Sequence, residues 1–306
     1  MRVIVTGSRG QLARCLADRA APGDDIFYAA RPEIDLESPE ALARLVAAHR
    51  PELVINAAAF TQVDAAESEP ARAMQVNAVA PDVLARAAAE VGALLVHVST
   101  DYVFDGRAPT PYAEDAAPSP INLYGRSKLA GEQAIAASGA AHVIARVSWL
   151  FSEYGRNFVR TMLALAESRD AIDVVADQRG VPNYAGDVAD ALWRIARTRI
   201  AERRADGEIV NVVGRESCTW ADFAEAIFAQ SARLGGPVAE VRRVPSSAFP
   251  TPAARPANSV LDAHRLEADY GFALPSWRDA LEVVVGRILA ERGIACASAQ
   301  QSTASA

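Results

Sequence analysis

The sequence predicts an α/β protein whose core is a doubly wound parallel sheet covered by helices on both faces. Three observations predict it: short continuous apolar runs rich in β-branched residues, helix-like stretches between these runs, and a glycine-containing turn directly after the first run. Strands buried on both faces read as continuous apolar runs, and their alternation with helices is typical of parallel sheets.

The first half of the chain alternates regularly between predicted strands and helices. We expect strands over residues 2–7, 25–30, 53–58, 94–99 and 142–147, and helices over 11–20, 39–49, 69–90 and 124–137. Later the pattern is less regular, with helices expected over 157–167 and 187–197, a strand over 172–175 and an extended segment over 209–212. The proline-bearing stretch 245–256 is expected to wrap a surface, because proline cannot donate to a sheet ladder.

Composition and charge argue against several function classes. The chain has 306 residues, 51% of them hydrophobic, and a net charge of -7, so no basic surface for nucleic acid is expected. No apolar run approaches about 18 residues and the chain opens on a strand pattern, so we expect neither membrane insertion nor export. The cysteines Cys15, Cys218 and Cys296 are far apart and lack zinc-like spacing, which predicts a reducing, cytoplasmic location and no metal site.

A glycine-containing turn joins the first predicted strand to the first predicted helix. Gly7 and Gly10 form the turn, Gln11 and Leu12 open the helix, and Ala13 is small enough to let the helix approach the sheet. In this context, backbone N–H groups and a helix N-terminus can bind a pyrophosphate. The turn therefore predicts a dinucleotide site, although two glycines between a strand and a helix also occur in purely structural turns.

The end of the second predicted strand indicates which dinucleotide is used. An acidic residue at this place binds the ribose 2′-hydroxyl of NADH, whereas this chain has Ala30 and Arg31. We therefore expect NADPH, with NADH possible; an ordinary solvated arginine is the alternative interpretation of Arg31. Asp35 and Leu36 are the next expected contacts, since the Asp35 carboxylate could accept from the adenine amino group. Small residues that leave room for the cofactor, or that simply pack closely, end the third strand at Ala57, Ala58 and Ala59.

These observations predict a Rossmann-type core and a smaller lobe. We expect the core over residues 1–150, with 181–208 returning to it, and a substrate-binding lobe over 151–180 and 209–294. The ligand cleft is expected between them. Residues 295–306 are small and polar, and we expect them to form a disordered tail.

Tyr124 and Lys128 are four residues apart, which places them on one face of the predicted helix. A nearby ammonium is expected to lower the tyrosine pKa from about 10, making Tyr124 a better proton donor to a developing alkoxide. The same ammonium can bind the nicotinamide ribose, and we expect both Tyr124 and Lys128 to contact the cofactor. This spacing also occurs on ordinary exposed helices, so the pair is interpreted together with its surroundings.

The fourth predicted strand ends in Ser99 and Thr100, at the rim of the sheet where ligands of such folds bind. Thr100 could donate to the same carbonyl oxygen as Tyr124, or it could merely cap the following turn. Because the dinucleotide turn, the strand-end hydroxyl and the Tyr/Lys helix occur in this order, we interpret Thr100, Tyr124 and Lys128 as catalytic.

At these positions the chain resembles the extended short-chain dehydrogenases, and within them the dTDP-4-dehydrorhamnose reductase subfamily. The resemblance runs nearly end to end, and its more specific marks are residues 99–106 and the segment Pro250-Thr251-Pro252. It is also carried by residues 6–12, 54–61, Val63-Asp64, Glu67, Glu69, Tyr124-Gly125, 127–129, 131–132, Ser148-Trp149, Asn157-Phe158, Asp177-Gln178, Gly180, Pro182 and Arg255-Pro256.

The resemblance implies an activity and a set of roles. The implied reaction is the NADPH-dependent reduction of the C4 ketone of dTDP-4-dehydro-6-deoxy-L-mannose to dTDP-L-rhamnose, the last step of dTDP-rhamnose biosynthesis, with Thr100, Tyr124 and Lys128 as the catalytic triad. Related dehydratases carry an acidic residue where this chain has Tyr102, which favours simple reduction. The residues implied to line the sugar-nucleotide side are Thr61, Val63, Asp101, Tyr102 and Trp149.

Two departures from the family pattern and two further residue types need interpretation. Asn183 stands where threonine is expected, and Cys15 stands where some members hold a magnesium ion at a dimer contact, so we predict no metal and either a monomer or a homodimer. Arg255 is a candidate for a nucleotide phosphate, although an arginine among prolines can equally fasten a wrapped segment. The four histidines have no metal-like spacing, and His97, inside an apolar strand, is interpreted as a buried histidine without a role.

Other functions remain open on the same scaffold. One is another nucleotide-sugar 4-keto reductase or an epimerase, which would differ in the sugar accepted and in whether cofactor is consumed. A different class is a catalytically silent, cofactor-binding regulatory subunit, against which the intact Thr100, Tyr124 and Lys128 argue.

Overall fold

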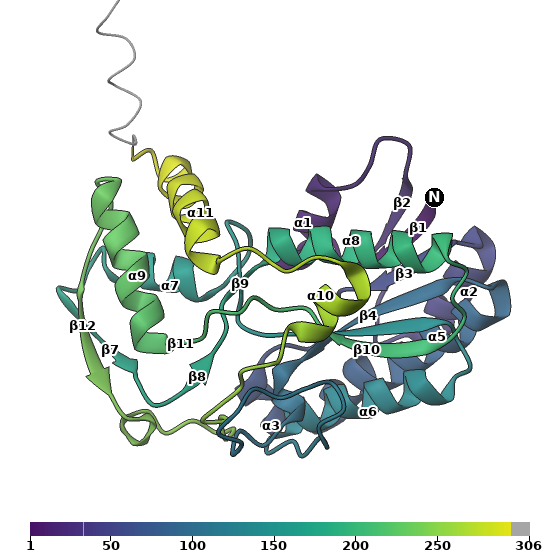
Figure 1. Ribbon diagram of the computed structural model, residues 1–306, viewed down its shortest axis with the longest axis horizontal. Helices are drawn as coiled ribbons and strands as arrows, with labels where there is room; N and C mark the ends of the chain where they lie inside the picture. Colours follow the sequence, from purple (N-terminus) through teal and green to yellow (C-terminus); the bar gives the residue numbers. More distant parts are fainter. Residues whose placement is uncertain (33, 295–306) are drawn as a thin grey trace, which may run out of the picture.

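The computed structural model describes residues 1–32 and 34–294, and its centre is a six-stranded parallel sheet (Figure 1). The strand order is β10-β5-β4-β3-β1-β2, so the chain builds outward from β1 in both directions, as in doubly wound folds. The predicted fold class is confirmed. The strands are β1 (Arg2–Thr6), β2 (Asp25–Ala29), β3 (Leu53–Asn56), β4 (Leu94–Thr100), β5 (His142–Val147) and β10 (Gly207–Asn211).

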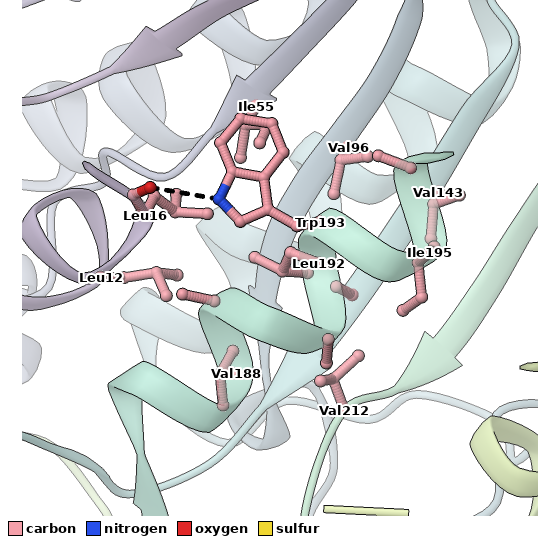
Figure 2. Packing of buried hydrophobic residues seen from close by; sticks show 14 of the residues in the cluster. Leu12, Leu16, Ile55, Val96, Val143, Val188, Leu192, Trp193, Ile195 and Val212 are labelled. Carbon is pink, nitrogen blue, oxygen red and sulfur yellow. Dashed lines mark hydrogen bonds between the residues drawn. The ribbon is translucent and has the colours of Figure 1, made fainter. Parts of the chain in front are cut away.

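One face of the sheet is covered by α1 (Gln11–Asp18) and α8 (Ala185–Ala201), whose apolar side chains share one buried cluster with the strands. Figure 2 shows Trp193 of α8 within this cluster, where its Nε1 donates to the Leu16 carbonyl oxygen at 3.1 Å. Because this bond satisfies the polar atom of a buried indole, Trp193 can fill the space between the two helices and the sheet. The position of α1, which begins at the glycine-containing turn, is fixed in this way.

The opposite face is covered by α2 (Pro39–His49), α5 (Ala80–Val91) and α6 (Leu123–Ala137). Their apolar residues pack on the strand residues that alternate with those of the first face, such as Ile4 and Val54. Alternation to the two faces follows from the period of two in a strand. Helix α6 carries Tyr124 and Lys128, so its packing sets the geometry of the site.

The helix expected over residues 69–90 is interrupted in the structure. It is divided into α4 (Pro70–Met74), a π-helical turn over Gln75–Val79, and α5, while α3 (Val63–Ser68) precedes it. Asn77 lies in the π turn, where its side chain accepts from Phe60 N at 2.8 Å and donates to Ser127 Oγ of α6 at 2.9 Å. The interruption therefore brings a buried amide against α6. Single π turns of this kind are frequent at functional sites.

The C-terminal part forms a second hydrophobic cluster beside the sheet. Three helices that the sequence analysis did not assign lie here or nearby: α9 (Trp220–Arg233), α10 (His264–Tyr270) and α11 (Trp277–Glu291). The remaining elements are α7 (Phe158–Leu165) and the two-stranded pairs of β6 (Leu150–Phe151) with β9 (Asn183–Tyr184), β7 (Ala171–Val175) with β12 (Glu240–Val244), and β8 (Arg179–Gly180) with β11 (Cys218–Thr219).

The division into a core and a lobe stays a prediction, and the two separate clusters support it. Its boundary needs one correction, because β10 pairs with β5 and so belongs to the central sheet rather than to the lobe. Leu266 and Tyr270 of α10 also pack in the cluster of the sheet. The expected disordered tail, 295–306, lies outside the described residues.

The proline-bearing stretch 245–256 wraps the surface, as expected, with only a short 3-10 helix over Ser246–Ala248. It is fastened to the core, since Asn122 Nδ2 donates to the Ala254 carbonyl oxygen at 2.8 Å and Arg255 pairs with Asp64. Among the described helices, none has the length and apolar character needed to cross a membrane.

Candidate active site

A cavity of about 890 Å³ opens at the carboxyl ends of the central strands, and it brings together nearly all the predicted site residues. This volume is in the range of small-molecule and cofactor sites. The predicted catalytic residues Thr100, Tyr124 and Lys128 line it. So do the predicted cofactor residues Gly7, Gly10, Gln11, Leu12, Ala30, Arg31, Asp35, Leu36, Ala57, Ala58 and Ala59.

The glycine-containing turn is shaped to receive a bulky group close to its backbone. Gly7 has a φ of +85°, which side chains rarely adopt, and a Cβ there would stand 3.3 Å from Cβ of Ala58. At Gly10, which precedes α1, a Cβ would meet nothing within 4 Å, so the backbone faces open space. The turn and the helix N-terminus therefore fit a pyrophosphate.

The adenosine end of the cavity carries more charged side chains than Arg31 and Asp35, which the sequence predicted. Arg31 lies 3.6 Å from Asp35 and 3.7 Å from Glu37, while Arg72 from α4 contacts Glu37 at 2.9 Å. Arg9 also lines the cavity. Arg9 lies inside the predicted turn, so its place in the site could have been predicted from the sequence. Arg72 is distant from Glu37 along the chain, and the fold brings the two together. These arginines give a 2′-phosphate cationic partners, and in this state Asp35 faces Arg31.

Tyr124 is held at the cavity wall by the first turn of α6. Asn122 caps this helix by accepting from Gly125 N at 2.8 Å, and Glu67 accepts from Leu123 N at 2.7 Å. Burial raises the pKa of Tyr124 to about 12, while the Thr100 hydroxyl opposes and the Asp101 charge supports this rise. At neutral pH the phenol is therefore protonated and able to donate.

Lys128 is almost fully buried, and its ammonium does not act on Tyr124 as the sequence analysis expected. Its Nζ donates to the Val98 carbonyl oxygen at 2.7 Å and lies 3.1 Å from His97 Nε2. Burial lowers the pKa of Lys128 to about 8, against the raising effect of the Glu132 charge. The expected lowering of the Tyr124 pKa is wrong in this state, because burial dominates that pKa and the ammonium is directed toward β4.

Thr100 and Asp101 end β4 inside the cavity. Thr100 Oγ1 lies 3.0 Å from Asp101 Oδ1 and also accepts from Tyr102 N at 3.2 Å, so Thr100 does cap the following turn while facing the cavity. Asp101 Oδ2 is buried without a hydrogen-bond partner among the described residues. Burial raises the pKa of Asp101 to about 7, in spite of the nearby hydroxyls of Ser259 and Thr100.

Trp149 forms an aromatic wall on the side of the C-terminal lobe. Its ring stacks on that of Trp220 with centroids 3.5 Å apart and an interplanar angle of 8°. Its φ of +41° is unusual for a residue with a side chain, and unusual backbone conformations of this kind cluster at functional sites. Gly180 leaves room for the indole, since a Cβ at that position would overlap it.

The other predicted substrate residues are divided between the cavity and its surroundings. Thr61, Asp101 and Trp149 line the cavity, whereas Val63, Tyr102 and Arg255 do not. The Tyr102 ring still lies 5.8 Å from the Tyr124 ring. Arg255 Nη2 donates to Asp64 at 2.8 Å and its Nη1 to the Ala253 carbonyl oxygen at 2.7 Å. In this state Arg255 fastens the proline-bearing segment, and its contact with a phosphate stays a prediction.

The two departures from the family pattern are both buried. Asn183 accepts from Gly214 N at 2.7 Å and donates to the Ser148 carbonyl oxygen at 2.8 Å, so its amide joins two loops. Burial raises the pKa of the Cys15 thiol to about 12. Within residues 1–32 and 34–294, no group of three or more His, Cys, Asp or Glu side chains is arranged to hold a metal ion.

Comparison with known proteins agrees with this geometry. The model of the RmlD substrate binding domain family matches residues 1–289. The dTDP-4-dehydrorhamnose reductase of Sinorhizobium fredii is 41% identical over 292 residues, covering 95% of this chain and 99% of that protein. The enzyme of the same name from Escherichia coli is 38% identical over 297 residues, covering 95% and 98%.

This chain belongs to the dTDP-4-dehydrorhamnose reductase family. A crystal structure of such a reductase from Bacillus anthracis, in complex with NADP, superimposes with a TM-score of 0.86 at 37% identity, covering 92% of this chain and 98% of that one. The UDP-glucose 4-epimerase of Thermus thermophilus shares the fold, with a TM-score of 0.76 at 22% identity. The resemblance seen in the sequence is therefore confirmed at the level of the reductase family.

Proposed function

We propose that this protein reduces the C4 ketone of dTDP-4-dehydro-6-deoxy-L-mannose to dTDP-L-rhamnose with NADPH. The observation that carries the proposal is the placement of the Tyr124 phenol and the Thr100 hydroxyl in the same cavity as the glycine-containing turn. One cavity can thus hold a dinucleotide and present a proton donor to a carbonyl beside it. Membership of the reductase family supports the substrate class.

The residues of the cavity fit NADPH. The open backbone at Gly10 and the positive φ of Gly7 suit the pyrophosphate, and Arg9, Arg31 and Arg72 offer cations to the 2′-phosphate. The bound cofactor would supply the hydride for the ketone carbon. Lys128 would hold the nicotinamide ribose through its ammonium.

Thr100 and Tyr124 would act on the ketone oxygen. Thr100 would orient and polarise the carbonyl through its hydroxyl hydrogen, and Tyr124 would donate its proton to the oxygen as negative charge develops there. The raised pKa of Tyr124 suits the reductive direction, because the phenol keeps its proton until the oxygen needs it. The buried, partnerless Oδ2 of Asp101 would accept from a sugar hydroxyl.

A second candidate is the reduction of a different keto sugar. The probable dTDP-4,6-dihydroxy-2-methyloxan-3-one 4-ketoreductase of Streptomyces antibioticus is 41% identical over 294 residues, covering 95% of this chain and 96% of that protein. The same Tyr124 and Thr100 would serve such a ketone, so the sugar pocket decides between the two candidates.

The test is NADPH oxidation with enzymatically generated dTDP-4-dehydro-L-rhamnose, with NADH measured in parallel. Consumption of NADPH with formation of dTDP-L-rhamnose is expected. Binding of NADPH without consumption would contradict the proposal and leave another keto sugar or a silent regulatory role, whereas sugar isomerisation without net consumption would indicate an epimerase.

We propose further that the protein works in the cytoplasm, as a monomer or a homodimer, without binding nucleic acid. Cys15 and Cys218 are both buried as free thiols, which supports a reducing compartment. The net charge of -7 supports the absence of nucleic-acid binding.

A further inference from the structure

Lys128 is connected to a chain of buried polar side chains that crosses the central sheet. Its Nζ lies 3.1 Å from His97 Nε2, His97 Nδ1 lies 2.9 Å from Asn56 Nδ2, and Asn56 Oδ1 accepts from Thr6 Oγ1 at 2.7 Å. The register of the parallel strands pairs His97 of β4 with Asn56 of β3, and Asn56 with Thr6 of β1. The three residues are therefore neighbours because of the sheet, although they are far apart in sequence.

The side chains of this hydrogen-bonded row are closed to solvent. Thr6 and His97 have exposed fractions of 0%, and Asn56 has 1%. Each buried polar atom must then find its partner within the protein, since an unpaired one would bear the full cost of losing its water. Which atom donates and which accepts is therefore constrained at every step from Lys128 to Thr6.

The charge of Lys128 fixes that order. A neutral imidazole has one donating and one accepting nitrogen, while an ammonium only donates. A charged Lys128 therefore requires His97 Nε2 to accept and Nδ1 to carry the proton. The Asn56 carboxamide must then be rotated by 180° from the orientation given above, so that its oxygen accepts from His97 Nδ1 and its nitrogen donates to Thr6 Oγ1; the rotation leaves the distances unchanged. Thr6 Oγ1, which accepts from Ala58 N at 3.1 Å, then accepts two hydrogen bonds. A neutral Lys128 amine would allow the reverse order, with Nε2 protonated.

The surroundings keep His97 neutral and Lys128 near the point of ionisation. Burial lowers the pKa of His97 well below its usual value, with the charges of Lys128 and His142 acting in the same direction. The pKa of Lys128 is lowered to about 8 by burial, and Glu132 on the next turn of α6 opposes this. At neutral pH an uncharged imidazole thus faces an ammonium.

We propose that His97 is the positioning residue of Lys128: its Nε2 accepts a hydrogen bond from the ammonium, and Asn56 selects the tautomer that leaves this nitrogen free. The inference rests on the proposed function only in that Lys128 serves the cofactor there. No role for His97 was expected from the sequence, because the strand register that sets it beside Lys128 is not visible in a linear pattern.

Loss of the acceptor would disfavour the ammonium. Lys128 would keep the Val98 carbonyl oxygen but leave one N–H unpaired in a buried place, so its pKa would fall. The expected fall is about one to two units, which is the size that corresponds to a hydrogen bond to a charged group. Lys128 would then lose its proton at a lower pH, within the neutral range.

The amino-acid composition of the protein makes the pKa of Lys128 directly measurable. Among the 31 lysine and arginine residues, Lys128 is the only lysine. Protein labelled with 13C and 15N in lysine therefore gives one lysine side-chain resonance, whose titration reports the pKa of Lys128 without cofactor or substrate.

The first experiment is NMR of the unliganded full chain with labelled histidine, with His97 assigned by its disappearance in His97→Gln. The expected spectrum shows a neutral ring protonated at Nδ1 between pH 6 and 7.5. A ring protonated at Nε2, or a charged imidazolium, in that range would overturn the proposal.

The second experiment titrates Lys128 in three variants. His97→Phe keeps a ring but removes the acceptor, and it is expected to lower the Lys128 pKa by about one to two units. His97→Gln, whose Oε1 can reach the place of Nε2, is expected to restore most of that pKa. His142→Phe is the matched control, because His142 is a buried histidine of the neighbouring strand that bonds to the Ala140 carbonyl oxygen, and it is expected to leave the pKa unchanged.

An unchanged pKa in His97→Phe, or an equal fall in His97→Gln, would overturn the proposal. In turnover assays the alkaline limb of kcat/KM should move to lower pH in His97→Phe and return in His97→Gln. If the NMR results agree with expectation while no keto sugar is reduced, the proposed function fails and the pairing of His97 with Lys128 stands.

Discussion

Gly131 of α6 lies directly against the main-chain carbonyl of Asn77 in the π turn, so that a Cβ on Gly131 would overlap the carbonyl oxygen. The contact sets the distance between α6 and the helices before it. Asn77 also holds Ser127, which precedes Lys128 in the chain, through a 2.9 Å hydrogen bond. Alignment of the Tyr124 and Lys128 face with the cavity thus depends on a residue without a side chain.

Substitution of Gly131 by alanine should destabilise the protein and reduce turnover. Overpacking a closed contact costs about 1–3 kcal/mol, which exceeds the gain of about 1 kcal/mol from a better helix former. Urea unfolding measures the stability, and NADPH oxidation measures the turnover. The matched control is Gly286→Ala in α11, where the nearest atom would be 3.8 Å from the new Cβ and a gain in stability is expected. Equal effects of the two substitutions would contradict the close contact at Gly131.

Substitution of Tyr124 by phenylalanine should lower kcat by about 10²–10⁴, because the proton donor to the ketone oxygen is lost. The dissociation constant of NADPH, measured by fluorescence titration, should stay the same, since the phenol hydroxyl is expected to serve the ketone rather than hold the dinucleotide. Unchanged turnover would remove Tyr124 from the mechanism. A large loss of cofactor affinity would instead indicate a binding role.

Substitution of Asp101 by asparagine should flatten the dependence of stability on pH. The pKa of Asp101 is about 7 in the folded protein and 3.8 in a free side chain, so the folded state binds the proton more tightly. The contribution of Asp101 to the free energy of unfolding is greatest below pH 3.8, and it is lost as pH rises through about 7. The loss is on the order of a few kcal/mol.

Urea unfolding of Asp101→Asn and of the unsubstituted protein at pH 5 and pH 8 measures this difference. The unsubstituted protein should lose more stability between these pH values than the variant does. Parallel changes in the two proteins would show that Asp101 is ionised in both the folded and the unfolded state over this range.

Substitution of Arg31 by alanine should raise the KM for NADPH about tenfold or more, while the KM for NADH changes less, because a hydrogen bond to a charged phosphate is lost only with NADPH. The control is Arg44→Ala, which removes the same charge from an exposed position on α2 that does not line the cavity. Equal effects on the two cofactors would mean that Arg31 does not contact the 2′-phosphate.

Local sequence patterns predicted those features that depend on residues close together in the chain. The alternation of apolar runs with helical stretches predicted the order of the elements around the sheet, and Gly7 with Gly10 predicted the turn that faces the cavity. The missed helix α9 did have a local pattern: Thr219 and Asp222 form a capping box at its start. The interruption near Asn77 also had a local signal, because Pro81 has no N–H to donate to the carbonyl oxygen of Asn77, four residues earlier.

By itself, the sequence determined the doubly wound fold, the dinucleotide turn and the Tyr124 and Lys128 spacing, since each depends on residues within a few positions of one another. Only the tertiary structure decided that Lys128 meets His97, that Arg72 meets Glu37, and that Trp149 stacks on Trp220. Each of these pairs joins segments that are distant along the chain and become neighbours through strand register and helix packing. The pKa values of Tyr124, Lys128 and Asp101 also depend on burial, which is a property of the assembled molecule and overrode the effect expected from spacing alone.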